Sequence, residues 1–106
     1  MTLAGAVHLL LHAAVPAAVA LLWFREHWLR AWLWMMAGMV VDLDHLLAVP
    51  VYDPGRCSIG FHPLHQPLPI LFYAVLAAAP RTRLLGIGLL IHMALDAGDC
   101  TVQGLW

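Results

Sequence analysis

The chain consists of apolar segments separated by short polar stretches. The first two apolar segments cover roughly residues 3–24 and 28–49. At about 1.5 Å per residue, each is long enough to cross the ~30 Å hydrocarbon core of a bilayer as a helix. Two shorter segments follow, roughly residues 67–79 and 84–97, which cross only if their polar ends are buried in protein or line a wet cavity. The pattern predicts an all-α fold, an integral membrane bundle of about four transmembrane helices.

The polar connections carry turn signals. Residues 25–27 (Arg-Glu-His) end the first segment, and Pro50 ends the second. A polar loop over residues 51–66 contains an Asp-Pro-Gly turn at 53–55, and residues 80–83 (Pro-Arg-Thr-Arg) form a tight turn between the last two segments. We find no internal repeat. The interpretation is therefore a single transmembrane domain over residues 1–106.

Composition agrees with a lipid environment. The 106 residues are 63% hydrophobic and 10% charged, with a mean hydropathy of +0.85, whereas a soluble domain carries about 25% charged residues. A soluble chain this short could not bury so much apolar surface, because small domains bury a smaller share of theirs. The net charge is −1, with five arginines and no lysine. This excludes the basic face that nucleic-acid binding needs.

The arginines predict an orientation. Arg25 and Arg30 lie around the first turn, and Arg81 and Arg83 lie in the last turn, while the opposite side has only Arg56. The positive-inside rule places the two arginine turns in the cytoplasm. The termini and the long loop then face the periplasm of a bacterial inner membrane. Tryptophan favours membrane interfaces, and a group of tryptophans marks the surface at the first turn: Trp23, Trp28, Trp32 and Trp34.

Histidines and carboxylates gather at the opposite membrane surface, because an even number of crossings brings their segments to one side. Three pairs among them are three or four residues apart, the spacing that places two side chains on one helix face. Neutral imidazoles with carboxylates suit zinc, manganese or iron, and the chain has no cysteine quartet for a structural zinc site. The candidate metal ligands are His8, His12, Asp42, His45, His62, His65, His92 and Asp96.

The cost of polar groups near lipid favours a function for this set. A charged side chain at the centre of a membrane helix costs roughly 2.5–3.5 kcal/mol on insertion scales. One or two divalent ions, zinc first and manganese or iron next, would neutralise the carboxylates. A bis-histidine haem and a proton or ion relay remain as alternatives. A single membrane histidine taken alone is more often a packed, hydrogen-bonded group than a ligand.

These motifs resemble two groups of bacterial membrane proteins. Residues 41–45 (Val-Asp-Leu-Asp-His), an early-helix histidine, a central histidine pair and the late His92-x-x-x-Asp96 occur in this order in the membrane-bound metal-dependent hydrolases. Residues 53–65, Asp-Pro-x-Arg-Cys-Ser-Ile-Gly-Phe-His-Pro-Leu-His, resemble a small uncharacterised integral-membrane family. The resemblance spans His8 to Asp99 and implies the ligand set above. One departure is that only two residues separate the central histidines here, in place of the hydrolases' His-Arg-Gly-x-Thr-His-Ser.

The resemblance implies metal-assisted hydrolysis. A site at the outer membrane face would meet phospholipid head groups or lipid-linked phosphate esters, which are the expected substrates. A metal ion lowers the pKa of bound water and polarises a phosphoryl oxygen. Asp44 and Asp99 are the candidate general bases. The alternative is a non-catalytic accessory subunit of a larger membrane complex or homo-oligomer, with a structural metal site. An open coordination position would favour the enzyme, and a closed four-ligand site would favour the structural role.

The two cysteines, Cys57 and Cys100, fall on the same outer face in this topology. An oxidising exterior permits a disulfide between them. Such a bridge would hold the loop that carries His62 and His65 against the last helix. Metal-bound thiolates and buried free thiols remain as alternatives.

Overall fold

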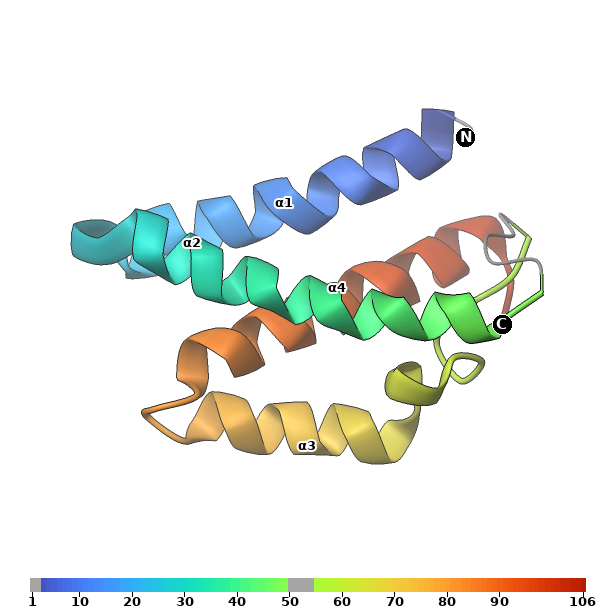
Figure 1. Ribbon diagram of the computed structural model, residues 1–106. Coiled ribbons are helices and arrows are strands. Elements are labelled where there is room, and N and C mark those ends of the chain that lie inside the picture. Colours follow the sequence, from blue (N-terminus) through green and yellow to red (C-terminus); the bar gives the residue numbers. More distant parts are fainter. Residues whose placement is uncertain (1–2, 50–54) are drawn as a thin grey trace.

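The computed structural model describes residues 3–49 and 55–106. Within these ranges the fold is all-α, with no strand. The helices run up and down in chain order, so that both ends of the chain lie at the same end of the bundle (Figure 1). The predicted helix stop at Pro50 and the start of the predicted 53–55 turn lie outside the described residues.

The first half of the chain forms α1 over Leu3–Trp23, a short 3-10 turn η1 over Arg25–His27, and α2 over Trp28–Met36. The helix after α2 tightens into a 3-10 helix, η2, over Ala37–Leu47. Sequence periodicity predicted one α-helix here, so this is a correction. A 3-10 helix rises about 2.0 Å per residue and eclipses side chains three apart, and runs beyond four residues are uncommon. Together α2 and η2 extend about 35 Å.

The second half forms a short η3 over Pro63–His65, α3 over Pro67–Ala78, and α4 over Arg83–Gln103. We predicted that the last helix ends near residue 97, but α4 continues through the polar residues that follow and is 21 residues long. It ends at Gly104, whose φ of 66° is the left-handed conformation typical of a helix C-terminus. The amide of Leu105 donates to the carbonyl of Cys100, 2.9 Å away, and closes that turn.

Small residues let α4 approach its neighbours closely. A side chain on Gly86 would meet the backbone of Ala77 in α3, and one on Gly88 would meet the backbone of Met35 in α2. These glycines allow close contact between helices, and α4 packs against α1, α2 and α3. Its Leu89 and Met93 join the buried apolar cluster with Val41 and Tyr73.

The polarity of the bundle is inverted relative to a water-soluble protein. Large apolar side chains cover the outside: Leu22 is 71% exposed, Leu47 77% and Leu68 78%. Histidines and carboxylates fill much of the interior at one end, where His65 is fully buried and Asp96 is 5% exposed. Soluble proteins place these residue types the other way round. Both α1 and α4 are long and apolar enough to cross a membrane.

Candidate metal centre

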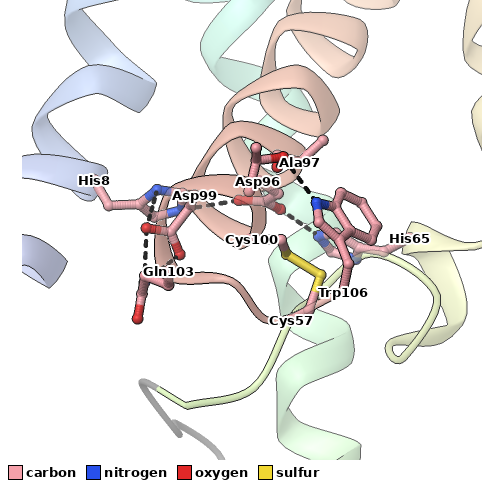
Figure 2. The surroundings of a disulfide bond; sticks show 10 residues. His8, Cys57, His65, Asp96, Ala97, Asp99, Cys100, Gln103 and Trp106 are labelled. Atoms are coloured by element: carbon pink, nitrogen blue, oxygen red, sulfur yellow. Dashed lines mark hydrogen bonds and ion pairs between the residues drawn. A yellow bond between two sulfur atoms is a disulfide. The ribbon is translucent and has the colours of Figure 1, made fainter.

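Asp96 lies at the centre of a cluster of imidazoles, and its two carboxylate oxygens face different histidines. Its Oδ1 lies 2.9 Å from Nε2 of His8 and 3.2 Å from Nε2 of His12, both on α1. Its Oδ2 lies 3.0 Å from Nε2 of His65 and 3.2 Å from Nε2 of His92. Figure 2 shows the side chain of Asp96 between His8 on one side and His65 on the other. Four imidazoles from three segments thus present the same ring nitrogen to one carboxylate.

One group of possible ligands comprises Asp42, His65, His92 and Asp96, whose ligand atoms all lie within 4.8 Å of one another. The Nε2 atoms of His65 and His92 are 3.3 Å apart. Oδ1 of Asp42 lies 3.5 Å from the first and 3.0 Å from the second. Ligand atoms around a tetrahedral ion at ~2.0–2.1 Å lie about 3.3–3.4 Å apart. The spacing of these nitrogens and oxygens therefore matches a tetrahedral ion of that size.

Hydrogen bonds outside the cluster set the orientation of His65. Its Nδ1 donates to Oδ2 of Asp44, 2.9 Å away, and the same oxygen accepts the amide of Leu64 at 2.9 Å. With the proton on Nδ1, the lone pair of Nε2 points into the cluster. This carboxylate–histidine arrangement is typical of metal-binding imidazoles. We predicted Asp44 as a candidate general base. Its hydrogen bond to Nδ1 of His65 indicates that it orients this imidazole.

His12 and His92 are oriented in the same way. Nδ1 of His12 donates to the carbonyl of His8 at 2.7 Å, and Nδ1 of His92 lies 3.3 Å from the sulfur of Met39. Their Nε2 atoms then face carboxylate oxygens. Nε2 of His12 is buried, has no well-aligned hydrogen bond within the described part of the chain, and faces Oδ1 of Asp96 at 3.2 Å. A buried nitrogen lone pair that faces a carboxylate oxygen is costly unless a cation lies between them.

The pKa of His65 shows how strongly this cluster attracts positive charge. Burial opposes protonation of His65, but hydrogen bonds to Asp42, Asp96 and Asp44 outweigh burial and raise its pKa to about 10. The carboxylates therefore hold a proton on this imidazole at neutral pH when no other cation is bound. A divalent ion would replace that proton.

Another group of possible ligands comprises Asp44, His45 and His62, and it lies beside the Asp96 cluster. Nδ1 of His45 is 3.1 Å from Oδ1 of Asp44, and Nδ1 of His62 is 4.0 Å from it. The two imidazoles stack with ring centroids 3.8 Å apart and an angle of 25° between planes. Nearly parallel rings aim their lone pairs poorly at one point. Burial, and then the neighbouring His45, lower the pKa of His62.

Asp99, the other predicted general base, lies at the rim of the cluster. Both its oxygens accept the side-chain amide of Gln103 at 2.9 Å. Its Oδ1 is 3.9 Å from Nδ1 of His8, beyond hydrogen-bond distance. The side chain of Asp99 is 31% exposed, so it meets solvent as well as the first histidine of the cluster.

A disulfide joins Cys57 to Cys100, with the Cα atoms 5.3 Å apart. Cys100 lies one helical turn after Asp96, so the bridge holds the 55–66 loop against the site (Figure 2). The hydroxyl of Tyr73 also donates to the carbonyl of Leu64, 2.8 Å away, and anchors the loop to α3. Of the three alternatives for these cysteines, the structure contains the disulfide. The two sulfurs are therefore not available as thiolate ligands for a metal ion.

Residues 2–103 match a family described as a family of unknown function, DUF6122. The chain belongs to that family. No curated protein and no solved structure matches it significantly. The DUF6122 match agrees with the resemblance to an uncharacterised family, and it assigns no activity and offers no link to the hydrolases.

Two further residues contribute to this site and were not predicted from the sequence. Met39 contacts His92 and Tyr73 anchors the loop. Tyr73 had a signal, since it is a polar group within a short apolar helix. Met39 had only its position, three residues before Asp42.

Proposed function

We propose that this chain is an integral membrane protein that binds a divalent metal ion at one end of its helical bundle. The observation that carries the proposal is that Nε2 of His65 and Nε2 of His92 lie 3.3 Å apart, and that each lies 3.0–3.5 Å from an oxygen of Asp42 and an oxygen of Asp96. Two imidazoles and two carboxylates with this spacing suit zinc, with manganese or iron as further candidates. Oriented outer hydrogen bonds, such as that from His65 to Asp44, strengthen such ligands.

The membrane location rests on the inverted polarity of the bundle. Its outer surface is apolar along α1, η2 and α3, where water would be excluded by lipid. Each 21-residue helix extends about 31 Å, and α2 with η2 extends about 35 Å, which suits a ~30 Å hydrocarbon core. The 12-residue α3 reaches only about 18 Å, so its polar end must be buried in protein or line a wet cavity.

Two independent features support one orientation. The arginine turns around residues 25–30 and 81–83 favour the cytoplasm. The Cys57–Cys100 disulfide, at the opposite end, favours an oxidising compartment. Both support our proposal that the candidate metal centre faces the periplasm at the surface of a bacterial inner membrane.

The reaction class that suits such a centre is hydrolysis of phosphate esters, and phospholipid head groups or lipid-linked phosphates are the substrates within reach at that surface. A bound metal ion would lower the pKa of a water ligand and polarise a phosphoryl oxygen. The order of motifs shared with the membrane-bound metal-dependent hydrolases supports this reading. A second candidate is a non-catalytic subunit of a larger membrane complex, favoured by the four protein ligands of the Asp42 group, which leave a tetrahedral ion no open position.

Metal analysis of the purified protein tests the proposal. We expect at least one tightly bound divalent ion per chain in detergent, and its loss in His65→Ala. His27→Ala is the matched control, because His27 is exposed at the other end of the bundle and should leave the metal content unchanged. A wild-type protein that binds no divalent ion would overturn the metal function. Labelling of an introduced terminal cysteine only after permeabilisation would overturn the orientation.

A further inference from the structure

We propose that the metal centre is dinuclear: a second divalent ion binds to His8, His12 and Oδ1 of Asp96, and the Asp96 carboxylate bridges the two ions. The inference rests on the proposed metal-binding function and deepens it. It assigns different tasks to the two ions, which a single ion in the Asp42 group could not perform.

The first argument is the division of the Asp96 carboxylate. Oδ2 faces His65 and His92 of the first group, and Oδ1 faces His8 and His12. His8, His12 and Asp96 form a second group, whose ligand atoms also lie within 4.8 Å of one another. A carboxylate that gives one oxygen to each of two ions places them close together, and paired metal sites have separations of about 3.5–4 Å. The second group therefore adjoins the first.

The second argument is that protons alone satisfy the second group poorly. His12 has its Nδ1 proton on the carbonyl of His8, so a neutral His12 presents a lone pair to Oδ1 of Asp96 at 3.2 Å. Nε2 of His12 is buried and without a hydrogen-bond partner among the described residues. Nε2 of His8 approaches the same oxygen to 2.9 Å. A cation among these three atoms removes the clash of lone pairs.

The third argument is charge. The described residues at this end include four carboxylates close to the imidazoles, those of Asp42, Asp44, Asp96 and Asp99. One divalent ion neutralises half of that charge, whereas two neutralise all of it. Unpaired carboxylates next to apolar helices are costly, and the second ion relieves this cost.

The two ions differ in coordination. The first has four protein ligands and is closed. The second has three protein ligands, which leaves a position for water or for an oxygen of a phosphate. His8 is 24% exposed and Asp99 31%, so the second ion lies on the side that solvent reaches. The first ion thus holds the helices together, and the second carries the reactive water.

Metal stoichiometry and magnetic coupling test the proposal. Mn²⁺ titration of the wild-type protein in detergent should reach two ions per chain, with an electron paramagnetic resonance spectrum of a spin-coupled pair. His12→Ala should bind one ion and give an uncoupled spectrum. His27→Ala, the control, should behave as wild type. Circular dichroism checks that each variant is folded, and His12→Gln replaces His12→Ala if the latter does not fold.

The outcomes separate the two proposals. One ion per wild-type chain at saturation, lost in His65→Ala and retained in His12→Ala, would overturn the dinuclear centre and leave the single-ion function standing. No ion in the wild-type protein would overturn both. Two uncoupled ions in the wild-type protein would also contradict the Asp96 bridge. Loss of one ion and of the coupling in His12→Ala supports it.

Discussion

The two ends of the bundle treat charge in opposite ways. One end of the bundle, here called the metal end, contains the candidate metal centre. Every histidine except His27 lies there among carboxylates, and most of these groups are buried and contact one another. At the other end, the arginines of the two turns are exposed. Arg83 there donates to the carbonyls of Ala77 and Ala78 and satisfies the end of α3. Charge in the interior needs a specific partner in a specific place, whereas charge at the surface is satisfied by water and by loosely held neighbours.

The opposite end of the bundle, here called the arginine end, also has a cavity of about 440 Å³, and the residues that line it differ from those of the metal end. Its lining includes Arg30, Arg81 and His27 with the apolar walls of Trp34 and Leu85, and no carboxylate. The metal end has the reverse composition. The chain is therefore strongly polarised along its length, with basic groups in open positions at one end and acidic groups in closed positions at the other. Substitutions at the two ends should differ in cost accordingly.

The largest expected effect is that of Asp96→Ala. It removes one ligand from both metal groups and leaves the remaining imidazoles and Asp42 without their shared partner. We expect loss of bound metal and a fall of at least ~3–5 kcal/mol in the free energy of unfolding. Metal analysis and denaturation in detergent micelles measure both. The control is Glu26→Ala at the other end, which should change neither the metal content nor the free energy of unfolding. Equal metal content in the two variants would contradict the role of Asp96 as a ligand.

The second effect concerns the bridge over the metal end. Cys57→Ser with Cys100→Ser opens a loop with a sequence separation of 43 residues. In the chain-entropy account this costs up to about 4 kcal/mol of stability. It also frees the loop that carries His65, so metal should dissociate faster. The check is unfolding and metal release of the double variant against wild type, each with and without reductant. If wild type loses nothing on reduction, the bridge does not support the site.

The third effect is pH dependence in the metal-free protein. The pKa of His65 is raised to about 10 in the fold, against about 6.5 in the unfolded chain. Its stabilising contribution is therefore complete below about pH 6.5 and is lost as the pH rises through about 10. Metal binding displaces the same proton, so metal affinity should change the other way and rise up to about tenfold per pH unit over that range. Unfolding of metal-free protein and metal titrations between about pH 6 and 8 check the opposite signs; a pH-independent affinity would contradict His65 as a ligand.

The smallest expected changes in stability are at the arginine end, where two nearby arginines can be compared. Arg83→Ala removes the two hydrogen bonds to the end of α3 and should cost about 0.5–1.5 kcal/mol. Arg81→Ala removes an exposed side chain and should stay within about 0.5 kcal/mol of wild type. Metal content should be unchanged in both. Chemical denaturation of the two variants side by side measures the difference, and a metal loss in either would show that the ends are coupled.

Sequence patterns predicted the helices and the gathering of ligands because both follow from local spacing. His92 and Asp96 are four apart, and an antiparallel course brings them near His8 and His12. The end of α4 was missed because its polar residues resemble a loop, although Asp99 among them lies at the rim of the site. The long 3-10 form of η2 was missed because hydrophobic periodicity does not distinguish it from an α-helix at this length.

The division of the ligands into groups could not be predicted from spacing alone. Asp44 and His45 belong to the same short motif as Asp42, yet only Asp42 joins His92 and Asp96. The 55–66 loop decides this, because its bridge and its Tyr73 hydrogen bond bring His65 between Asp42 and Asp44. Such long-range contacts have no local signature, and the same is true of the contact between Met39 and His92.

The central position of α4 has a consequence for biogenesis. The ribosome completes α4 after the other three helices, and this helix brings His92, Asp96 and Cys100 at once. Until α4 is made, Asp42 and the α1 histidines lack the Asp96 and His92 partners that they have in the folded chain. Formation of the disulfide, and the proposed metal loading, must therefore follow synthesis of the last helix. A chain that stops before α4 leaves these polar groups without partners beside apolar helix faces, so the partial bundle should be much less stable than the full one.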